Sequence, residues 1–390
     1  MDRRKIIETF RNKFQGEPRV FRSPGRINII GEHTDYNNGF VLPAAVDKEI
    51  ILLMTPNDSD SFNIYSIDQD ESVNFSLTNY ESVKTEWAKY LIGVIDQILK
   101  AGHQIRGFDC VFGGNIPIGA GLSSSAALEC ATLFGISECF NLNLEKRQIA
   151  QMAQKAENEY VGVNCGIMDQ FASVFSKKSH ALKIDCRDLT YESFEIKFGN
   201  YTLMLVDSMV KHNLASSEYN IRRQECEAAV KAISANYPEI KSLRDASIDQ
   251  LTEVRNLISD KIFNRAKYII QEISRVNQAC DAIKQNDLVE LGQLLYATHY
   301  GLQHEFEISC EELDFLVDFT RDKSYILGSR MMGGGFGGCT INLIDSDYQE
   351  EFAKEVSEAY EKHFGKAPGI YFVKTANGSS EIKELQLANE

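Results

Sequence analysis

The sequence predicts a protein of the α+β class that divides into two domains. With 390 residues and 43% hydrophobic content, the chain can bury a large core and exceeds the usual length of one domain. Strand patterns and helical periodicities are mixed along the chain, without an internal repeat or a low-complexity tract. We expect an N-terminal α/β domain over residues 1–195 and a C-terminal α+β domain over residues 196–390, with a site between them.

The N-terminal half begins with strands and continues with helices. Residues 1–14 combine an early charge cluster with a helical pattern, and short strand patterns run from residue 19 to residue 65. The later elements are a helix at 83–101, a strand at 105–112, helices at 123–140 and 144–160, and a strand at 181–186.

The C-terminal half is helical in the middle and returns to strands at its end. A strand at 202–207 precedes a mostly helical block at 216–320. Strands at 339–344 and 369–374 then flank a helix at 348–364. This succession is typical of a mixed domain with its own core.

Charge and cysteine content exclude several classes of protein. The formal net charge of −15 opposes encounters with nucleic acid and with anionic membrane surfaces, so any phosphate site must be built locally. Nine cysteines are scattered without a CxxC pair, which indicates reduced thiols in a cytoplasmic protein. The N-terminal segment lacks a long apolar core, so we expect neither a signal peptide nor a membrane span.

The segment SPGRINIIGEHTDYNNG, residues 23–39, gathers polar side chains at the end of an apolar run. Residues 26–30 alternate as a half-buried strand does, and Gly31 permits a sharp turn. Glu32, His33 and Asp35 then fan out from the strand end and offer the hydrogen bonds that a ligand with many hydroxyls needs. The alternative interpretation is a polar turn between two strands.

The segment GGNIPIGAGLSSSAALECA, residues 113–131, joins a strand to an alanine-rich helix through a small-residue loop. Its glycines let backbone amides approach phosphate oxygens, and the helix start and the serine hydroxyls favour the same ligand. The loop matches neither the Walker A pattern nor the Rossmann GxGxxG pattern. A glycine turn with a serine N-cap is the alternative.

The segment AENEYVGVNCGIMDQFAS, residues 156–173, places Asp169 in a small and apolar stretch. An ionised carboxylate there needs a partner, and Arg26 is the natural counter-charge if its strand is adjacent. A structural ion pair or an N-cap would also explain it. Glu157 and Glu159 lie close together, and the residues alone do not separate a functional acid from a solvated one.

Two further segments carry unusual composition. The run at 211–229 combines a helix start with polar side chains, and we interpret its Arg222 and Arg223 as surface or ion-pair residues. The segment GSRMMGGGFGGCTINLI, residues 328–344, places five glycines around Phe336 before an apolar strand, so its backbone can pack closely against a loop or a ligand.

Together these segments resemble the galactokinases, the sugar-kinase branch of the GHMP kinase family. The resemblance runs from residue 19 to about residue 344 and includes the three GHMP motifs in family order. It departs from the family at Met332, where many relatives have threonine, and this puts a hydroxyl contribution there in doubt. The fold it implies is a two-domain GHMP kinase with the active site between the domains.

The resemblance also implies the role of each site residue. Asp169 is the base at the reacting hydroxyl and Arg26 its charged partner, while Ser125 and Glu157 hold Mg²⁺. The sugar contacts are Glu32, His33, Asp35, Gly166 and Tyr219. The ATP contacts are Gly119, Ala120, Gly121, Leu122, Ser123, Ser124, Ser125 and Trp87. Tyr90 forms with Trp87 an aromatic pair that could equally be a core or edge pair.

The implied activity is ATP-dependent phosphorylation of the C1 hydroxyl of α-D-galactose, with Mg²⁺ and with the two small molecules as the only partners of a monomer. One alternative is a GHMP kinase for another substrate, such as N-acetylgalactosamine, an arabinose-type sugar, mevalonate or homoserine. The other is a regulator that responds to galactose and ATP without catalysis. The complete serine loop and the presence of Asp169 favour the enzyme.

Overall fold

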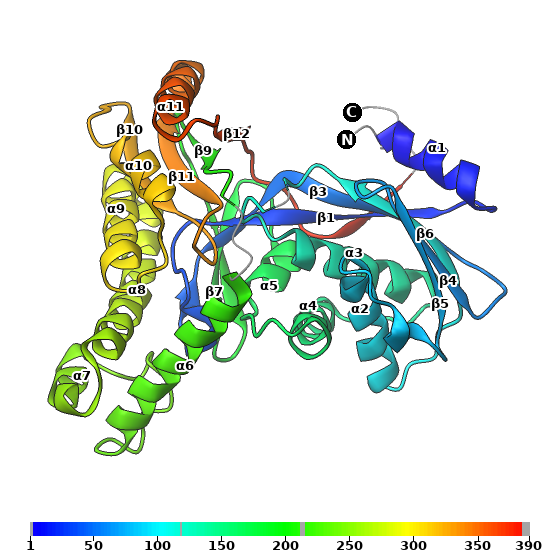
Figure 1. Cartoon of the computed structure of the whole chain (residues 1–390), viewed down its shortest axis with the longest axis horizontal. Coiled ribbons are helices and arrows are strands. Elements are labelled where there is room, and N and C mark those ends of the chain that lie inside the picture. Colours follow the sequence, from blue (N-terminus) through cyan, green and yellow to red (C-terminus); the bar gives the residue numbers. More distant parts are fainter. Residues whose placement is uncertain (1–2, 118, 211–214, 384–390) are drawn as a thin grey trace.

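The computed structural model describes residues 3–117, 119–210 and 215–383. The described chain forms two lobes, one around a six-stranded sheet and one around a four-stranded sheet with long helices beside it (Figure 1). Both lobes mix strands and helices, so the predicted α+β class is confirmed.

The first sheet lies in the N-terminal lobe and is antiparallel except where β6 and β4 pair in parallel. A buried cluster that includes Phe21 and Leu52 forms the core of this lobe and continues into the C-terminal lobe, for example at Leu205 and Leu294. The strands in sheet order are β13 (Ser380–Ile382), β1 (Arg19–Asn28), β3 (Pro43–Pro56), β6 (Phe108–Gly114), β4 (Ser61–Ser66) and β5 (Glu71–Ser76).

Helices cover both faces of this sheet (Figure 1). On one face, α1 (Arg3–Lys13) packs Ile6 and Phe10 against Val20 and Leu53. The opposite face is covered by α2 (Ala88–Lys100), α3 (Ser124–Cys139), α4 (Lys146–Lys155) and α5 (Met168–Phe175). Because both faces are covered, β1 is buried along most of its length and is not the half-buried strand that alternation predicted.

The second sheet lies in the C-terminal lobe, and all its strand pairs are antiparallel. Its strands in order are β10 (Ile326–Met331), β11 (Cys339–Asp345), β9 (Tyr201–Asp207) and β12 (Gly369–Phe372). The helices of the lobe are α6 (Ala215–Ser234), α7 (Ile248–Glu253), α8 (Asp260–Gln285), α9 (Leu288–His304), α10 (Glu311–Asp318) and α11 (Gln349–Phe364). Apolar side chains of α10 and α11 pack with those of β9 and β11 in one buried cluster.

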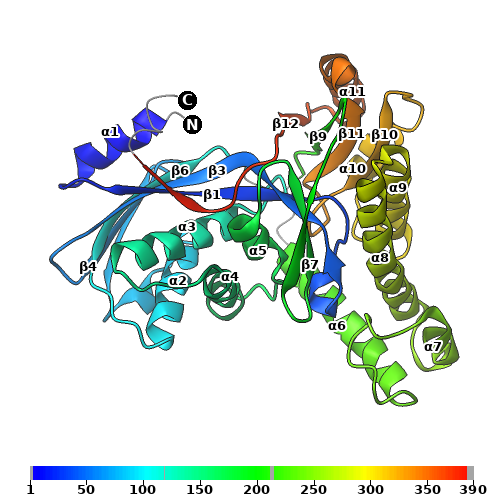
Figure 2. The ribbon, with the colours of Figure 1, turned by 180° about the vertical axis from the view of Figure 1, so that it is seen from behind.

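A small third sheet lies where the two lobes meet (Figure 2). It has the order β2 (Phe40–Val41), β7 (His180–Asp185) and β8 (Thr190–Glu195). Just after β7, the Cys186 N–H donates to the carbonyl of Gly39, the last residue of the polar segment 23–39. The third sheet therefore fixes the C-terminal end of the segment 23–39 against the residues that follow β7.

Local signals set several helix ends. The Ser259 hydroxyl accepts from the Ile262 N–H at the start of α8, and Asn286 ends this helix in a left-handed conformation. A capping box between Glu145 and Gln148 begins α4. The helix predicted at 144–160 is wrong in its second half, because α4 ends at Lys155 and a π-helical turn, Ala156–Val161, follows.

Most predicted elements are present, but several short ones were not predicted. They are α5, β5, β8, β10 and β13, which have from three to eight residues each. Segments this short give little periodicity, and tertiary pairing determines them. The domain boundary near residue 195 stays a prediction, and β13 returns the C-terminal segment to the first sheet through its pairing with β1.

All nine cysteines lie within the described residues and are free thiols. Among those residues, no helix combines the length and the apolar character that crossing a membrane requires.

Candidate active site

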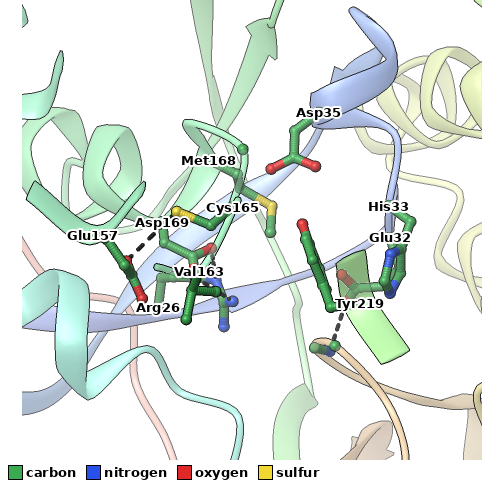
Figure 3. A pocket seen from close by; sticks show the side chains of 13 residues that line it. Arg26, Glu32, His33, Asp35, Glu157, Val163, Cys165, Met168, Asp169 and Tyr219 are labelled. Carbon is green, nitrogen blue, oxygen red and sulfur yellow. Dashed lines mark hydrogen bonds and ion pairs between the residues drawn. The ribbon is translucent and has the colours of Figure 1, made fainter. Parts of the chain in front are cut away.

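The turn after β1 presents three buried polar side chains to a cavity between the lobes (Figure 3). Gly31 has φ 104°, and a Cβ there would lie 2.9 Å from the Phe40 carbonyl oxygen, so the sharp turn requires glycine. Beyond it, Glu32, His33 and Asp35 are only 2%, 4% and 8% exposed. The predicted fan of polar side chains at the strand end is therefore present.

Arg26 and Asp169 form a two-pronged ion pair across the cavity floor (Figure 3). Arg26 Nε donates to Asp169 Oδ1 over 2.8 Å, and Nη2 donates to Oδ2 over 2.9 Å. Arg26 lies on β1 and Asp169 in the first turn of α5, so two packed elements fix the geometry. Burial opposes the Arg26 cation, but the charges of Asp169 and Glu32 outweigh it and raise its pKa. The predicted counter-charge is confirmed.

Asp35, Gly166 and Tyr219 meet on the opposite wall. A Cβ at Gly166 would lie 1.8 Å from Asp35 Oδ2, so only glycine leaves room for this carboxylate. The Gly166 N–H donates to the Tyr219 hydroxyl, which fixes the ring from α6. Burial, with the charge of Asp169 second, raises the pKa of Asp35 to about 6.

His33 lies in an aromatic cluster beside these groups. Its Nδ1 lies 2.7 Å from the Tyr36 hydroxyl, and its ring centroid lies 4.9 Å from that of Tyr219. Burial lowers the pKa of His33 to about 4, despite the opposing charge of Glu32. The imidazole is therefore neutral at physiological pH and can recognise a ligand by hydrogen bonds without adding charge.

These residues line one cavity of about 150 Å³. It contains every residue that the sequence resemblance assigned to the sugar or to catalysis, and Glu157 also lines it. The prediction omitted Val163, Cys165, Met168, Gly333 and Gly334. The first three flank Gly166 and Asp169 within the segment 156–173, and this proximity was the available signal. The two glycines belong to the 328–344 segment, whose small residues already indicated close backbone packing.

The small-residue loop before α3 is held against β1 and against the glycine-rich segment. The Arg26 N–H donates to the Leu122 carbonyl, and Arg26 Nη1 donates to the Gly121 carbonyl over 2.5 Å. Gly119 and Gly121 have φ values of 84° and 75°, which favour glycine. Cβ atoms built on Gly333 and Gly338 would lie within 3.7 Å of loop backbone atoms, so the two glycine-rich loops touch.

The serines of this loop have different environments. Ser123 is left-handed, with φ 56°, and its hydroxyl donates to Asp169 Oδ2 instead of capping α3. The Ser125 hydroxyl is hydrogen-bonded to the Glu157 carboxyl. Ser124 and Ser125 both line a second cavity. Ile118 in this loop and residues 211–214 of the run before α6 lie outside the described residues.

The structure separates Glu157 from Glu159, which the residues alone did not, although the resemblance already implied Glu157. Glu157 lies in the π-helical turn, is 8% exposed and accepts from Gln170 Nε2 over 2.7 Å. Burial and the charge of Asp169 raise the pKa of Glu157 to about 7. Glu159 points to the surface, where it pairs with Lys100 and Gln97. Only Glu157 belongs to the site.

The second cavity, of about 390 Å³, continues from the serine loop toward α2 and β6. Trp87 and Tyr90 line it together with Ser124 and Ser125. The Trp87 Nε1 donates to Glu71 Oε2 over 2.7 Å, and its ring lies 5.5 Å from that of Phe112. The aromatic pair and the serine loop therefore share one space, as a nucleotide with its phosphates requires.

Contacts in the structure explain the positions of Arg222, Arg223 and Met332. Arg222 is buried, where it pairs with Glu218 and donates to the carbonyls of Phe306 and Glu307, so it is an ion-pair residue away from the surface. Arg223 pairs with Glu227 on the surface, as the interpretation expected. Met332 is 1% exposed, and its N–H bonds to the Cys339 carbonyl, so it fills core space between the two glycine-rich loops.

Comparisons with known proteins agree with this geometry. Residues 8–56 match the family described as galactokinase galactose-binding signature, residues 89–177 match GHMP kinases N terminal domain, and residues 279–362 match GHMP kinases C terminal. The chain is 42% identical over 362 residues to the galactokinase of Thermosipho africanus, covering 93% of this chain and 99% of that protein. It is 37% identical over 385 residues to the galactokinase of Roseiflexus sp., covering 98% of each.

Solved structures give the same picture. Lactococcus lactis galactokinase complexed with galactose superposes with a TM-score of 0.93 at 34% identity, over 97% of this chain and 99% of that chain. Methanococcus jannaschii mevalonate kinase, at 18% identity and a TM-score of 0.68, shares the fold over 93% of this chain and 100% of that chain.

The two lobes, the serine loop and the glycine-rich loop define the protein as a GHMP kinase. Within this class, the chain belongs to the galactokinase family. The expected two-domain GHMP kinase fold is thereby confirmed.

Proposed function

We propose that this protein transfers the γ-phosphoryl group of ATP to the C1 hydroxyl of α-D-galactose, giving galactose 1-phosphate and ADP. The observation that carries the proposal is the Arg26 and Asp169 pair, which lies on the floor of the carboxylate-lined cavity and touches the serine loop. Membership of the galactokinase family supports the choice of sugar. An acid at this position can reach both the acceptor and the phosphoryl group.

Asp169 accepts or orients the proton of the sugar hydroxyl in this mechanism. Arg26 pairs with this carboxylate and fixes its orientation, and the position of Arg26 beside the Gly121 carbonyl supports a second role near the transferred phosphoryl group. Ser123 donates to the same carboxylate and limits its rotation. Phosphoryl transfer of this type depends mainly on positioning and electrostatics, which a rigid ion pair supplies.

The sugar hydroxyls are bound by Glu32, His33, Asp35, Gly166 and Tyr219. The two carboxylates accept hydrogen bonds, the neutral imidazole and the tyrosine donate or accept, and the lack of a side chain at residue 166 leaves room beside the ring. The cavity volume of about 150 Å³ supports a ligand of monosaccharide size.

ATP occupies the second cavity and the loop beside it. The backbone and hydroxyls of Gly119, Ala120, Gly121, Leu122, Ser123, Ser124 and Ser125 contact the phosphates, and Trp87 lies against the adenine. The start of α3 supports this orientation, because its free amides and positive dipole end face the same loop. The loop thus supplies positive potential in a protein of formal net charge −15.

The residues beside the loop fit a magnesium ion. Glu157 is a buried carboxylate with a raised pKa and no arginine or lysine partner among the described residues, and the Ser125 hydroxyl is bonded to it. Mg²⁺ usually takes one or two protein oxygens together with water and substrate phosphates, so Ser125 and Glu157 would hold it. When bound, the ion would offset charge on the ATP phosphates. No group of three or more acidic, histidine or cysteine ligands occurs within the described chain.

We further propose that the protein works as a cytoplasmic monomer on these two small molecules. The nine free thiols support a reducing compartment. The negative charge supports the absence of nucleic acid and of an anionic membrane surface among its partners.

The test is ADP release with magnesium and ATP across galactose, N-acetylgalactosamine, arabinose, glucose and mevalonate. Among these five substrates, we expect strong turnover only with galactose. We expect this turnover to be lost in Asp169→Asn. Turnover with a different sugar would keep the kinase and change the substrate. Galactose and ATP binding without turnover would overturn the enzyme assignment and indicate a regulator.

A further inference from the structure

Arg330 is a fully buried arginine on β10 that reaches across to the sugar-binding turn of the other lobe. Its Nη1 donates to Glu32 Oε1 over 3.0 Å and to the Met331 carbonyl over 2.6 Å. Its Nε donates to the Ile29 carbonyl over 2.8 Å, and Nη2 donates to the Asn28 carbonyl. One guanidinium therefore joins the end of β1, the carboxylate of Glu32 and its own strand.

The contacts leave one oxygen of Glu32 for a ligand. Oε1 is occupied by Arg330 and by the Gly333 N–H, which lies 2.9 Å away. Both donors to the Glu32 side chain come from the segment 330–333, so this segment orients the carboxylate group. Glu32 lines the sugar cavity, and its remaining oxygen can accept from a sugar hydroxyl.

The backbone of the same turn is also held from the C-terminal lobe. The Tyr268 hydroxyl donates to the Glu32 carbonyl over 3.2 Å, and the Gly31 N–H donates to Glu272 Oε1 over 2.8 Å. These bonds fix the main chain of the turn, whereas Arg330 is the only cation that pairs with the Glu32 side chain within the described chain. A buried carboxylate with a single cationic partner depends strongly on it.

We propose that Arg330 is a positioning residue for sugar recognition, which acts by pairing with the Glu32 carboxylate and directing it into the cavity. The inference rests on the proposed function of that cavity. The planar guanidinium is essential, because its fixed fork reaches four acceptors at once. Lysine has a single ammonium group with three donors and cannot reproduce that arrangement.

The test compares Arg330→Lys with Arg265→Lys as a matched control. Arg265 on α8 is 1% exposed and pairs with Glu225 and Glu307, away from the sugar cavity. We expect R330K to raise the galactose KM roughly 10- to 100-fold, the effect of losing a charged hydrogen bond, with kcat and the ATP KM nearly unchanged. R265K should lower thermal stability without changing the ratio of the two KM values.

A second comparison of two variants keeps the test decisive if R330K does not fold. E32Q is compared with the double variant E32Q/R330M, which buries no unpaired charge. If Arg330 acts through Glu32, E32Q raises the galactose KM and the second substitution adds little to that rise. A normal galactose KM in E32Q, or a large additional rise in the double variant, would overturn the proposal. If R330K raised the galactose KM and the ATP KM by the same factor, their ratio would stay unchanged as it should in R265K. Arg330 would then have only a structural role.

The same measurements separate this inference from the proposed function. Wild-type protein without galactose-dependent ADP release contradicts the proposed substrate. If another sugar is the substrate, the comparison of R330K with R265K is made with that sugar, and the role of Arg330 is still tested.

Discussion

The two cavities of the active site are built in different ways. The smaller one, proposed for the sugar, is lined by the carboxylates of Glu32, Asp35, Glu157 and Asp169, which come from the turn after β1, from the π-helical turn and from α5. The larger one, proposed for ATP, is lined mainly by apolar and hydroxyl-bearing groups, including Trp87 and Ser125, with Asp68 and Glu86 among its acids. We therefore expect sugar recognition to depend on charged side chains and ATP recognition to depend on backbone, hydroxyl and ring surfaces.

The carboxylates of the sugar cavity differ among themselves. Asp169 is paired with Arg26, and Glu32 is paired with Arg330. Asp35 accepts from the Tyr36 N–H but makes no ion pair within the described residues. Two of the carboxylates are therefore paired with guanidinium groups, whereas Asp35 and Glu157 have no cationic partner within the described residues. Substitutions of Glu32 or Asp35 should consequently alter sugar binding and leave ATP binding unchanged, whereas substitution of Asp169 should alter the transfer step.

The largest effect should come from Asp169→Asn. Asparagine keeps the shape but cannot take the hydroxyl proton, so we expect kcat to fall roughly 100-fold or more, the scale of losing a general base. It also leaves Arg26 with a weaker partner, so thermal stability should fall as well. ADP release and a thermal melt of the same preparation measure the two effects.

A control for the lost ion pair is Asp185→Asn. Asp185 pairs with Arg244 outside the sugar cavity, and both side chains are 18% exposed. This variant should keep wild-type kcat within about twofold, as substitutions away from special features usually do. Near-normal turnover of D169N would remove Asp169 from the mechanism.

The next effect should come from Asp35→Ala, which removes an acceptor for sugar hydroxyls. Charged hydrogen bonds contribute about 1.5–3 kcal/mol each, so the galactose KM should rise about 10- to 100-fold. The ATP KM should stay within about threefold, because Asp35 lies outside the nucleotide cavity. Steady-state kinetics with each substrate varied in turn measures both constants. An equal rise in both would contradict a sugar-specific role.

Acidification should weaken sugar binding through the same residue. The pKa of Asp35 in the free site is about 6, so the protonated form dominates at pH 5 and the ionised form at pH 7. If galactose binds the ionised form, its Kd should rise about tenfold from pH 7 to pH 5. Calorimetry without nucleotide or metal measures this Kd. His33 does not add to the effect, because its pKa of about 4 keeps the imidazole neutral between pH 5 and pH 7.

The raised pKa of Asp35 makes its contribution to stability change with pH in the opposite direction to that of an acid in a salt bridge. Because the pKa of Asp35 is raised from 3.8 to about 6 on folding, the folded state binds more protons than the unfolded state between these values. The contribution of Asp35 to stability therefore falls as pH rises through this window. Asp35→Asn should remove both the pH dependence of the galactose Kd and this contribution. A galactose Kd that stays pH-dependent in D35N would assign the effect to another group.

Local patterns predicted much of the site, because its parts are contiguous in sequence. Gly31 and the polar residues after it indicated a binding turn, and the glycines and serines of residues 119–125 indicated a phosphate loop. Arg330 was not predicted, since it meets Glu32 across 298 residues. Likewise, periodicity did not separate Glu157 from Glu159, and only the resemblance indicated Glu157, which the π-helical turn places in the cavity. Contacts between distant segments depend on the tertiary fold, which one sequence does not reveal.

The smallest effect should come from the nucleotide side, with Trp87→Ala. Loss of one aromatic contact typically costs about 0.5–1.5 kcal/mol, so the ATP KM should rise roughly two- to tenfold while the galactose KM is unchanged. Trp87→Phe keeps an aromatic face and loses the hydrogen bond to Glu71, so it should restore most of the ATP affinity if ring contact is the cause. Equal losses in both variants would assign the effect to the Glu71 bond, and an unchanged ATP KM in W87A would place the adenine elsewhere in the larger cavity.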